Sequence, residues 1–262
     1  RLAVFDFDRT LSGLHMYNVL SGGRLEGWGS PPELAASTEK GQLARLAELQ
    51  KDPEFQEQGG FALYAFGGPQ RVELLRELFS KLRAAGVECM VCSRGLVGPV
   101  RKALDLLGLL PFFSRVYGNV GEHYGAAPYD TQLQPQALGE DERYLGTPDR
   151  SLAAFGESKQ EVVAACMRER GLQGGEAVFI DDDPREVQAL KGTCATVQVQ
   201  GSGISALELD ALHRMIAGGP PPPPAAAGPP PTGAKAGGAL GSPGAPAGPK
   251  AVSGMAAAVS PG

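Results

Sequence analysis

Short apolar runs alternate with amphipathic segments over the first 200 residues, and this alternation restricts the fold more than any other feature. Runs typical of buried strands occupy residues 2–8, 87–93, 113–118, 176–183 and 195–200. Segments with helical spacing or helix-type ends lie at residues 32–51, 71–86, 99–108, 158–171 and 186–192. Strands separated by helices favour a parallel sheet with helices on both faces. The sequence therefore predicts an α/β fold, a Rossmannoid three-layer sandwich with a parallel sheet.

The composition changes sharply near residue 217. Residues 217–262 consist almost entirely of Gly, Pro, Ala and Ser, with two lysines and neither an acid nor an aromatic residue. Such a segment cannot bury enough apolar surface to offset the entropy lost on ordering. We expect a folded domain over residues 1–216 and a disordered Pro/Gly/Ala-rich tail over residues 217–262. The PPPPP run at 220–224 could bind an SH3 or WW module weakly, although a flexible extension is the favoured interpretation.

Net charge and hydropathy exclude two classes of partner. The formal net charge is −5, and the two tail lysines leave −7 on residues 1–216. With no run of Lys or Arg, this balance argues against a nucleic-acid-binding surface. No stretch of about 18 apolar residues occurs, so no membrane span is expected.

The four cysteines are expected to be ordinary core residues. Cys89 and Cys92 form a CxxC, but residues three apart on a strand point to opposite faces, and no second CxxC completes a metal site. Unpaired core cysteines fit a reducing compartment, and we expect a cytoplasmic location. Because the sequence begins at Arg1, we expect that it is a fragment or a processed form, and that a targeting signal could precede it.

Acids and a hydroxyl follow three of the expected strands. Asp6 and Asp8 end the first, Ser93 ends the second, and an Asp–Asp–Asp run at 181–183 ends the fourth. The carboxyl ends of parallel strands share one edge of a sheet, where ligands bind. Carboxylates gathered there repel one another without a counter-ion, and hard oxygen ligands suit Mg²⁺. The sequence therefore predicts a magnesium site at this edge.

The motifs resemble those of a known enzyme superfamily. DFDRT at 6–10, Ser93 after VECMVC, Lys159 and IDDDP at 180–184 resemble, in this order, the four motifs of the haloacid dehalogenase-like (HAD) superfamily. The resemblance covers residues 1–216 and implies a phosphatase of the DxDxT type. It implies Mg²⁺-dependent hydrolysis of a phosphate monoester through an aspartyl-phosphate, with Asp6 as the nucleophile and Asp8 as general acid and base.

The same resemblance assigns metal ligands. It implies that the side chains of Asp6 and Asp182 and the backbone carbonyl of Asp8 hold Mg²⁺, with Asp181 supporting the site, and leaves open which of the adjacent acids touches the ion. Asp183 is expected to cap the helix that begins near Pro184.

Substrate contacts follow from the resemblance as well. It implies that Thr10 and Ser93 bind phosphoryl oxygens and that Lys159 positions the nucleophile and screens its charge. Arg94 could contact the substrate, with a surface role about equally favoured.

Two insertions are expected to control access. Residues 13–66 are predicted to form a small first-site cap, from which His15, Tyr17 or Trp28 could reach the catalytic edge. Residues 119–157 are predicted to form a second-site loop. Modest insertions would leave the site fairly open, which would fit a large substrate such as a phosphoprotein. The expected partner is a phosphorylated small molecule or a phosphoprotein.

Three alternatives remain open at this stage. A phosphomutase of the same fold would return the phosphoryl group to its substrate instead of releasing phosphate. A receiver domain also uses acids, a hydroxyl and a lysine, but there the lysine comes last, whereas Lys159 precedes the second acid cluster. A catalytically silent scaffold with a proline-rich interaction tail is disfavoured by the intact motifs.

Overall fold

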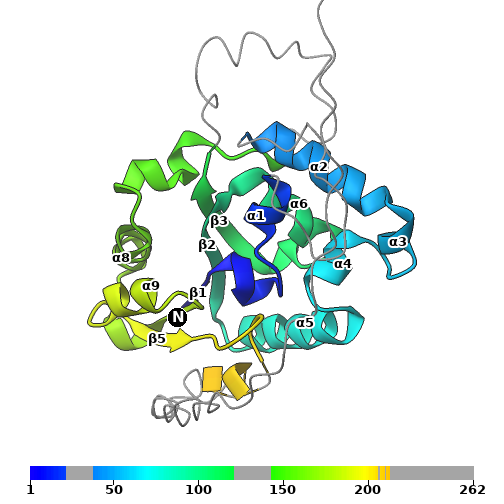
Figure 1. Cartoon of the computed structure of the whole chain (residues 1–262). Coiled ribbons are helices and arrows are strands. Elements are labelled where there is room, and N and C mark those ends of the chain that lie inside the picture. Colours follow the sequence, from blue (N-terminus) through cyan, green and yellow to red (C-terminus); the bar gives the residue numbers. More distant parts are fainter. Residues whose placement is uncertain (22–37, 121–142, 206, 210, 213–262) are drawn as a thin grey trace, which may run out of the picture. The chain divides into compact units, whose positions relative to one another are not determined.

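A computed structural model of the chain describes residues 1–21, 38–120, 143–205, 207–209 and 211–212 (Figure 1). The chain divides into two compact units, Arg1–Pro222 and Pro223–Gly262, and the described residues all belong to the first. The predicted tail at 217–262 therefore lies outside the described residues.

A parallel sheet confirms the α/β prediction. Its five strands within the described residues follow the order β3-β2-β1-β4-β5, and every neighbouring pair is parallel. The strands are β1 (Leu2–Phe5), β2 (Glu88–Leu96), β3 (Phe113–Asn119), β4 (Ala177–Asp181) and β5 (Ala195–Gln198).

Helices connect these strands and cover the sheet. Those described are α1 (Met16–Leu20), α2 (Glu39–Lys51), α3 (Pro53–Gln56), α4 (Phe61–Ala65), α5 (Pro69–Ala84), α6 (Val97–Leu106), α8 (Lys159–Arg170) and α9 (Pro184–Leu190). Shorter turns are η1 (Phe7–Leu11), η2 (Leu110–Phe112), η5 (Pro148–Arg150), η6 (Leu152–Phe155) and η7 (Gly174–Glu176). No helix in the described part of the chain is both long and apolar enough to cross a bilayer.

Alternate side chains of the central strand pack into two apolar clusters. Ala3 and Phe5 of β1 pack with residues of α5 and α6, whereas Leu2 and Val4 pack with residues of α8 and α9. Strands buried on both faces read as continuous apolar runs, which explains why the sequence reveals them. The sheet is thus the middle layer of a three-layer sandwich.

The cysteine prediction is confirmed for the fold. Cys89 and Cys92 belong to opposite apolar clusters, and all four cysteines of the chain are buried and unpaired. Burial raises the pKa of the Cys89 thiol to about 12, so this group is not a reactive thiolate.

Several helix ends follow local rules. Pro69 occupies the first position of α5, where the absent N–H is not needed. The Ser158 side chain caps α8 by accepting from the Glu161 N–H at 3.3 Å, and Gly171 ends that helix at a φ of +64°. The Ser158 cap places Lys159 on the first residue of α8.

All five strands differ at a boundary from the prediction, and two of the differences lie at the catalytic edge. The first strand ends at Phe5, not at Asp8, because the chain turns at Asp6 and the Ser12 N–H donates to the Phe7 carbonyl at 3.0 Å. The second strand continues beyond Ser93 to Leu96, although its pairing with β3 is irregular between Cys92 and Leu96.

The first insertion packs into the core of the sandwich. Met16, Leu46, Phe55 and Phe61 belong to the same apolar cluster as α5 and α6. The predicted helix at 32–51 is described from its N-cap, Thr38, onward. Trp28 and the rest of 22–37 lie outside the described residues, and the cap role of 13–66 stays a prediction.

The second insertion returns to the sheet edge. Residues 121–142 lie outside the described part, and the chain re-enters it ahead of η5. Ser151 forms a parallel bridge with Gly118 at the end of β3. The second-site loop at 119–157 is thereby fixed at its C-terminal part, while its role stays a prediction.

Candidate active site

Asp6 and Asp181 lie at the carboxyl ends of two neighbouring strands. β1 and β4 pair with Phe5 opposite Ile180, and the Asp6 N–H donates to the Ile180 carbonyl at 2.8 Å. The chain order changes direction between these strands, since β2 and β3 lie on one side and β5 on the other. Ligands of open α/β sheets bind at such a switch point.

A buried lysine joins the two aspartates. Lys159 Nζ lies 2.6 Å from Asp6 Oδ1 and 2.7 Å from Asp181 Oδ2, and the three side chains are 3%, 6% and 1% exposed. Burial alone would lower the pKa of Lys159, but the two carboxylates raise it well above its ordinary value. The lysine is therefore a fixed positive charge.

Three carboxylates converge beside this lysine. One oxygen from each of Asp6, Asp181 and Asp182 lies within 4.8 Å of the others. Burial raises the pKa of Asp6 to about 6 and that of Asp181 to about 7, although Lys159 lowers both. Asp181 also accepts from the Asp183 N–H at 2.8 Å. One lysine does not neutralise three close acids, so the donor set fits a divalent cation with oxygen ligands.

Asp8 lies apart from this cluster, against the first insertion. Its Oδ1 accepts from the Tyr17 N–H at 3.3 Å, and its Oδ2 lies 3.4 Å from His15 Nδ1. Burial raises the pKa of Asp8 to about 6. The prediction that His15 or Tyr17 reaches the catalytic edge fits these contacts, although Tyr17 acts through its backbone.

Asp183 accepts from the Arg185 N–H at 2.8 Å, which confirms its prediction as a helix cap.

The turn η1 presents Asp8, and Arg71 of α5 holds that turn. Arg9 takes a left-handed φ of +58° inside η1. The Arg71 guanidinium donates to the carbonyls of Leu11 at 2.7 Å, Phe66 at 2.8 Å and Thr10 at 3.0 Å. Sequence reasoning missed Arg71, because a charged residue in the first turn of an amphipathic helix carries no signal of such a role.

A cavity of about 420 Å³ collects most of the predicted site residues. Its lining consists of Asp6, Asp8, Arg9, His15, Ser93, Arg94, Lys159, Asp181, Asp182, Asp183, Pro184 and Glu186. Thr10 is the exception among the predicted residues. It is fully buried, and its hydroxyl has no hydrogen-bond partner among the described residues. The phosphoryl contact of Thr10 therefore stays a prediction.

The second strand contributes a hydroxyl and a cation to this cavity. Ser93 Oγ accepts from the Gly95 N–H at 2.9 Å, and a Cβ on Gly95 would lie 3.2 Å from that oxygen and 3.5 Å from Asp8 Oδ2. Gly95 thus keeps room beside two site oxygens, a role that the sequence did not reveal. Arg94, half exposed, pairs with Glu186 Oε1 at 2.6 Å, and both residues line the cavity.

Comparisons with known proteins give structural likenesses only. No family model matches the chain, and no curated protein sequence does. A predicted phosphatase from Clostridium acetobutylicum aligns with 16% identity over 80% of this chain and 89% of its own, at a TM-score of 0.40. The HAD domain of the effector protein Lem4 from Legionella pneumophila aligns with 14% identity over 82% and 93%, at 0.45. A HAD phosphatase from Thermococcus onnurineus aligns with 18% identity over 84% and 98%, at 0.39. Likenesses at these levels carry no information on substrate.

Proposed function

We propose that this chain is a Mg²⁺-dependent phosphatase of the HAD type, which hydrolyses a phosphate monoester through an aspartyl-phosphate on Asp6. The single observation that carries the proposal is the buried Asp6–Lys159–Asp181 array at the strand switch, with Asp182 in reach of the same point. A buried lysine shared by two acids at a strand switch is costly as pure structure, since three apolar residues would pack there without a desolvation cost.

The cluster of Asp6, Asp181 and Asp182 supports a magnesium site. By the motif resemblance, the carboxylates of Asp6 and Asp182 would hold Mg²⁺ together with the backbone carbonyl of Asp8, and Asp181, which bonds Lys159, would support them. When bound, the ion would neutralise charge on the phosphoryl oxygens and on the attacking carboxylate.

The chain's own residues carry the two half-reactions. A carboxylate oxygen of Asp6 attacks phosphorus, the bond from phosphorus to the ester oxygen breaks, and Asp8 gives its proton to the departing alcohol. Asp8 then takes a proton from a water molecule whose oxygen attacks the same phosphorus, which releases phosphate and restores the Asp6 carboxylate. The raised pKa of Asp8, caused by burial, suits a group that both gives and accepts a proton near neutral pH.

Other residues hold the transferring group. Lys159 screens the negative charge between Asp6 and the phosphoryl oxygens, and Ser93 offers a hydroxyl from near the end of the neighbouring strand. The substrate is a phosphorylated small molecule or a phosphoprotein. Arg94 and Arg9 line the cavity and could contact its remaining part.

Hydrolysis of p-nitrophenyl phosphate tests the proposal. We expect the wild type to release nitrophenol and inorganic phosphate in equal amounts with Mg²⁺ and to stop in EDTA. Asp6→Asn should abolish turnover while Glu48→Gln, which changes an exposed acid on α2, should not alter it. Activity in Asp6→Asn equal to that of the wild type would overturn the proposal. Nitrophenol released in excess over phosphate, in the presence of an alcohol acceptor, would indicate phosphoryl transfer instead.

A further inference from the structure

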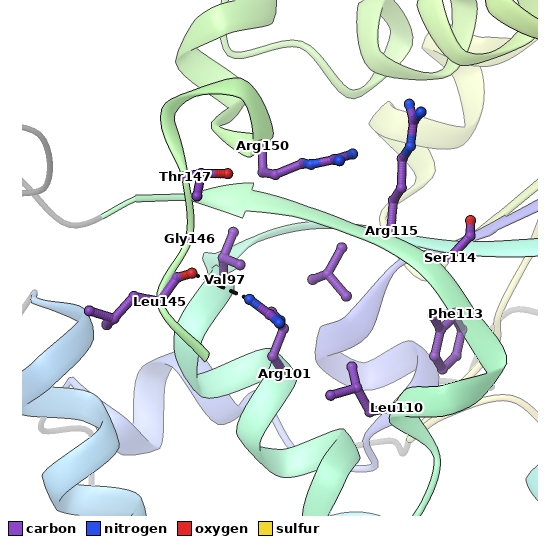
Figure 2. A pocket seen from close by; sticks show the side chains of 11 residues that line it. Val97, Arg101, Leu110, Phe113, Ser114, Arg115, Leu145, Gly146, Thr147 and Arg150 are labelled. Atoms are coloured by element: carbon purple, nitrogen blue, oxygen red, sulfur yellow. Dashed lines mark hydrogen bonds between the residues drawn. The ribbon is translucent and has the colours of Figure 1, made fainter. Parts of the chain in front are cut away.

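A histidine of the catalytic cavity has no role in the reaction described above. Among the described residues, the lining of this cavity, of about 420 Å³, includes one imidazole, that of His15. A second cavity, of about 310 Å³, lies between β3, α6 and residues 145–150 (Figure 2), and neither an acid nor a histidine of the described residues lines it. Of these two cavities, only the catalytic one therefore places a histidine beside an acid.

The two carboxyl oxygens of Asp8 have different neighbours. Oδ1 accepts from the Tyr17 N–H at 3.3 Å, whereas Oδ2 lies 3.4 Å from His15 Nδ1. A Cβ on Gly95 would lie 3.5 Å from Oδ2 and 3.2 Å from Ser93 Oγ. Oδ2 is thus the oxygen of Asp8 that lies near the Ser93 hydroxyl. Because the backbone occupies Oδ1, the proton that Asp8 gives to a leaving group belongs on Oδ2.

The fold does not require the His15 ring. The side chain is 45% exposed, and apart from its approach to Asp8 the ring has no polar partner among the described residues. His15 precedes α1, yet its side chain does not cap that helix, and the Asp8 carboxylate accepts an N–H of the first turn instead. The preceding backbone is held, since the Leu14 N–H donates to the Ala65 carbonyl at 3.2 Å. The chain therefore keeps the imidazole beside Asp8 without using it in the core.

We propose that His15 is a positioning residue for the general acid Asp8, and that its effect is largest on phosphate esters whose leaving group is an alkoxide. The inference rests on the proposed phosphatase reaction. As the bond from phosphorus to the ester oxygen breaks, its electron pair stays on that oxygen, which takes the proton of Asp8 Oδ2. Negative charge then appears on the Asp8 carboxylate, and the Nδ1–H of His15 donates to Oδ2.

This hydrogen bond acts mainly in the transition state. A carboxylate accepts more strongly than a protonated carboxyl group, so the bond strengthens while the proton leaves Asp8 and lowers the barrier. The separation of 3.4 Å between His15 Nδ1 and Asp8 Oδ2 is long for a hydrogen bond. Contacts of catalytic groups are often long without substrate and shorten when it binds.

Two esters that differ by one methylene group test the proposal in the full chain. The leaving group of p-nitrophenyl phosphate is a stabilised phenolate that needs little protonation. That of p-nitrobenzyl phosphate is an alkoxide, which must be protonated as it leaves. Phosphate release gives kcat/KM for each ester, and kcat/KM reports the steps up to the breaking of the ester bond. We expect His15→Ala to lower kcat/KM about tenfold for the benzyl ester, as for a lost hydrogen bond to a charged group, and less than twofold for the phenyl ester.

Conservative replacements of His15 show whether a donor at the position of Nδ1 is responsible. The amide nitrogen of Asn takes that position, whereas the amide nitrogen of Gln lies near the position of Nε2. His15→Asn should therefore recover most of the activity on the benzyl ester, and His15→Gln should not. Asn18→Ala changes an exposed residue of α1 outside the cavity lining, and this control should leave both kcat/KM values unchanged.

The outcomes separate the role of His15 from the function on which it rests. If the wild type hydrolyses neither ester with Mg²⁺, both proposals fail. If the wild type hydrolyses only the phenyl ester, no general acid acts and the role of His15 fails. If it hydrolyses both, but His15→Ala changes the two kcat/KM values by the same factor, only the role of His15 fails. An equal loss on both esters with a lowered thermal unfolding temperature would show a purely structural ring, which overturns the inference as well.

Discussion

Replacing Lys159 by Met removes the positive charge that two buried carboxylates share. The lysine lies 2.6 Å from Asp6 and 2.7 Å from Asp181, and all three side chains are at most 6% exposed. Removing one partner of a buried ion pair costs about 3–5 kcal/mol, because the remaining charge is buried without compensation. For a domain of this size, that corresponds to a fall in the unfolding temperature of roughly 10 °C.

The cost should depend on pH with a definite sign. Burial already raises the pKa values of Asp6 and Asp181 to about 6 and about 7 from an ordinary 3.8, and loss of Lys159 raises them further. An acid whose pKa is higher in the folded state than in the unfolded state loses stability as pH rises through the folded value. The variant should therefore be much less stable than the wild type at pH 8 in EDTA and closer to it at pH 5.

Thermal and urea unfolding in EDTA, each at the two pH values, measure this difference. Mg²⁺ should raise the stability of Lys159→Met more than that of the wild type, since the variant offers the ion a more negative site. Lys191→Met is the matched control, because Lys191 is exposed and its ammonium group donates to the Gln188 side chain at 2.9 Å without an ion pair among the described residues. A Lys159→Met protein as stable as the wild type at pH 8 in EDTA would refute the assignment of Lys159 as the counter-charge.

Three more substitutions test separate parts of the structure. Arg71→Met should lower the free energy of unfolding by about 3 kcal/mol and reduce kcat, because three backbone carbonyls lose a charged donor. Urea unfolding and turnover measure both quantities, and an unchanged kcat would show that η1 keeps its conformation without Arg71. Thr10→Val should raise KM about tenfold without lowering stability, since the predicted phosphoryl contact is lost while the buried hydroxyl has no partner among the described residues; a KM within twofold of the wild type would show that the hydroxyl does not contact phosphate. Glu88→Gln should cost about 1 kcal/mol at pH 7, a value reduced by solvent screening. Arg170 and Ser114 lower the pKa of Glu88 to about 2 from an ordinary 4.5, so the loss of stability in Glu88→Gln should vanish as pH falls from 4.5 to 2. Unfolding free energies of both proteins, measured across this pH range, check this, and a difference that persists at pH 2 would contradict it.

The gathering of acids at one sheet edge could be predicted from the sequence. Asp6, Ser93 and Asp181 each lie at or just beyond a buried apolar run, and parallel strands place such positions at a common edge. The order of the strands in the sheet could not be predicted from the sequence. That β1 and β4 are neighbours depends on how the connecting helices pack, and no local pattern specifies it.

Local turns that depend on distant residues were beyond prediction. The first strand was expected to reach Asp8, yet the chain turns after Phe5, and a guanidinium sixty residues away holds the turn. The same turn buries the Thr10 hydroxyl, whose contact with the substrate stays a prediction.

Glu39 is a second residue whose structural role could not be predicted from the sequence. This buried acid accepts from the Gly98 N–H at 2.7 Å and the Gly146 N–H at 3.0 Å, and so ties α2 to the start of α6 and to the second insertion. Burial raises its pKa. In the sequence it is one more glutamate of an amphipathic helix, because its two partners are backbone groups far along the chain.

Chemical trapping of the phosphorylated residue tests the central claim most directly. The wild type is quenched in acid during turnover of p-nitrophenyl phosphate and reduced with borohydride, which converts an aspartyl-phosphate into homoserine. Peptide mass spectrometry then locates the converted residue. The account predicts homoserine at position 6, only when substrate and Mg²⁺ are both present. Turnover without conversion at Asp6, or conversion at another residue, would contradict it.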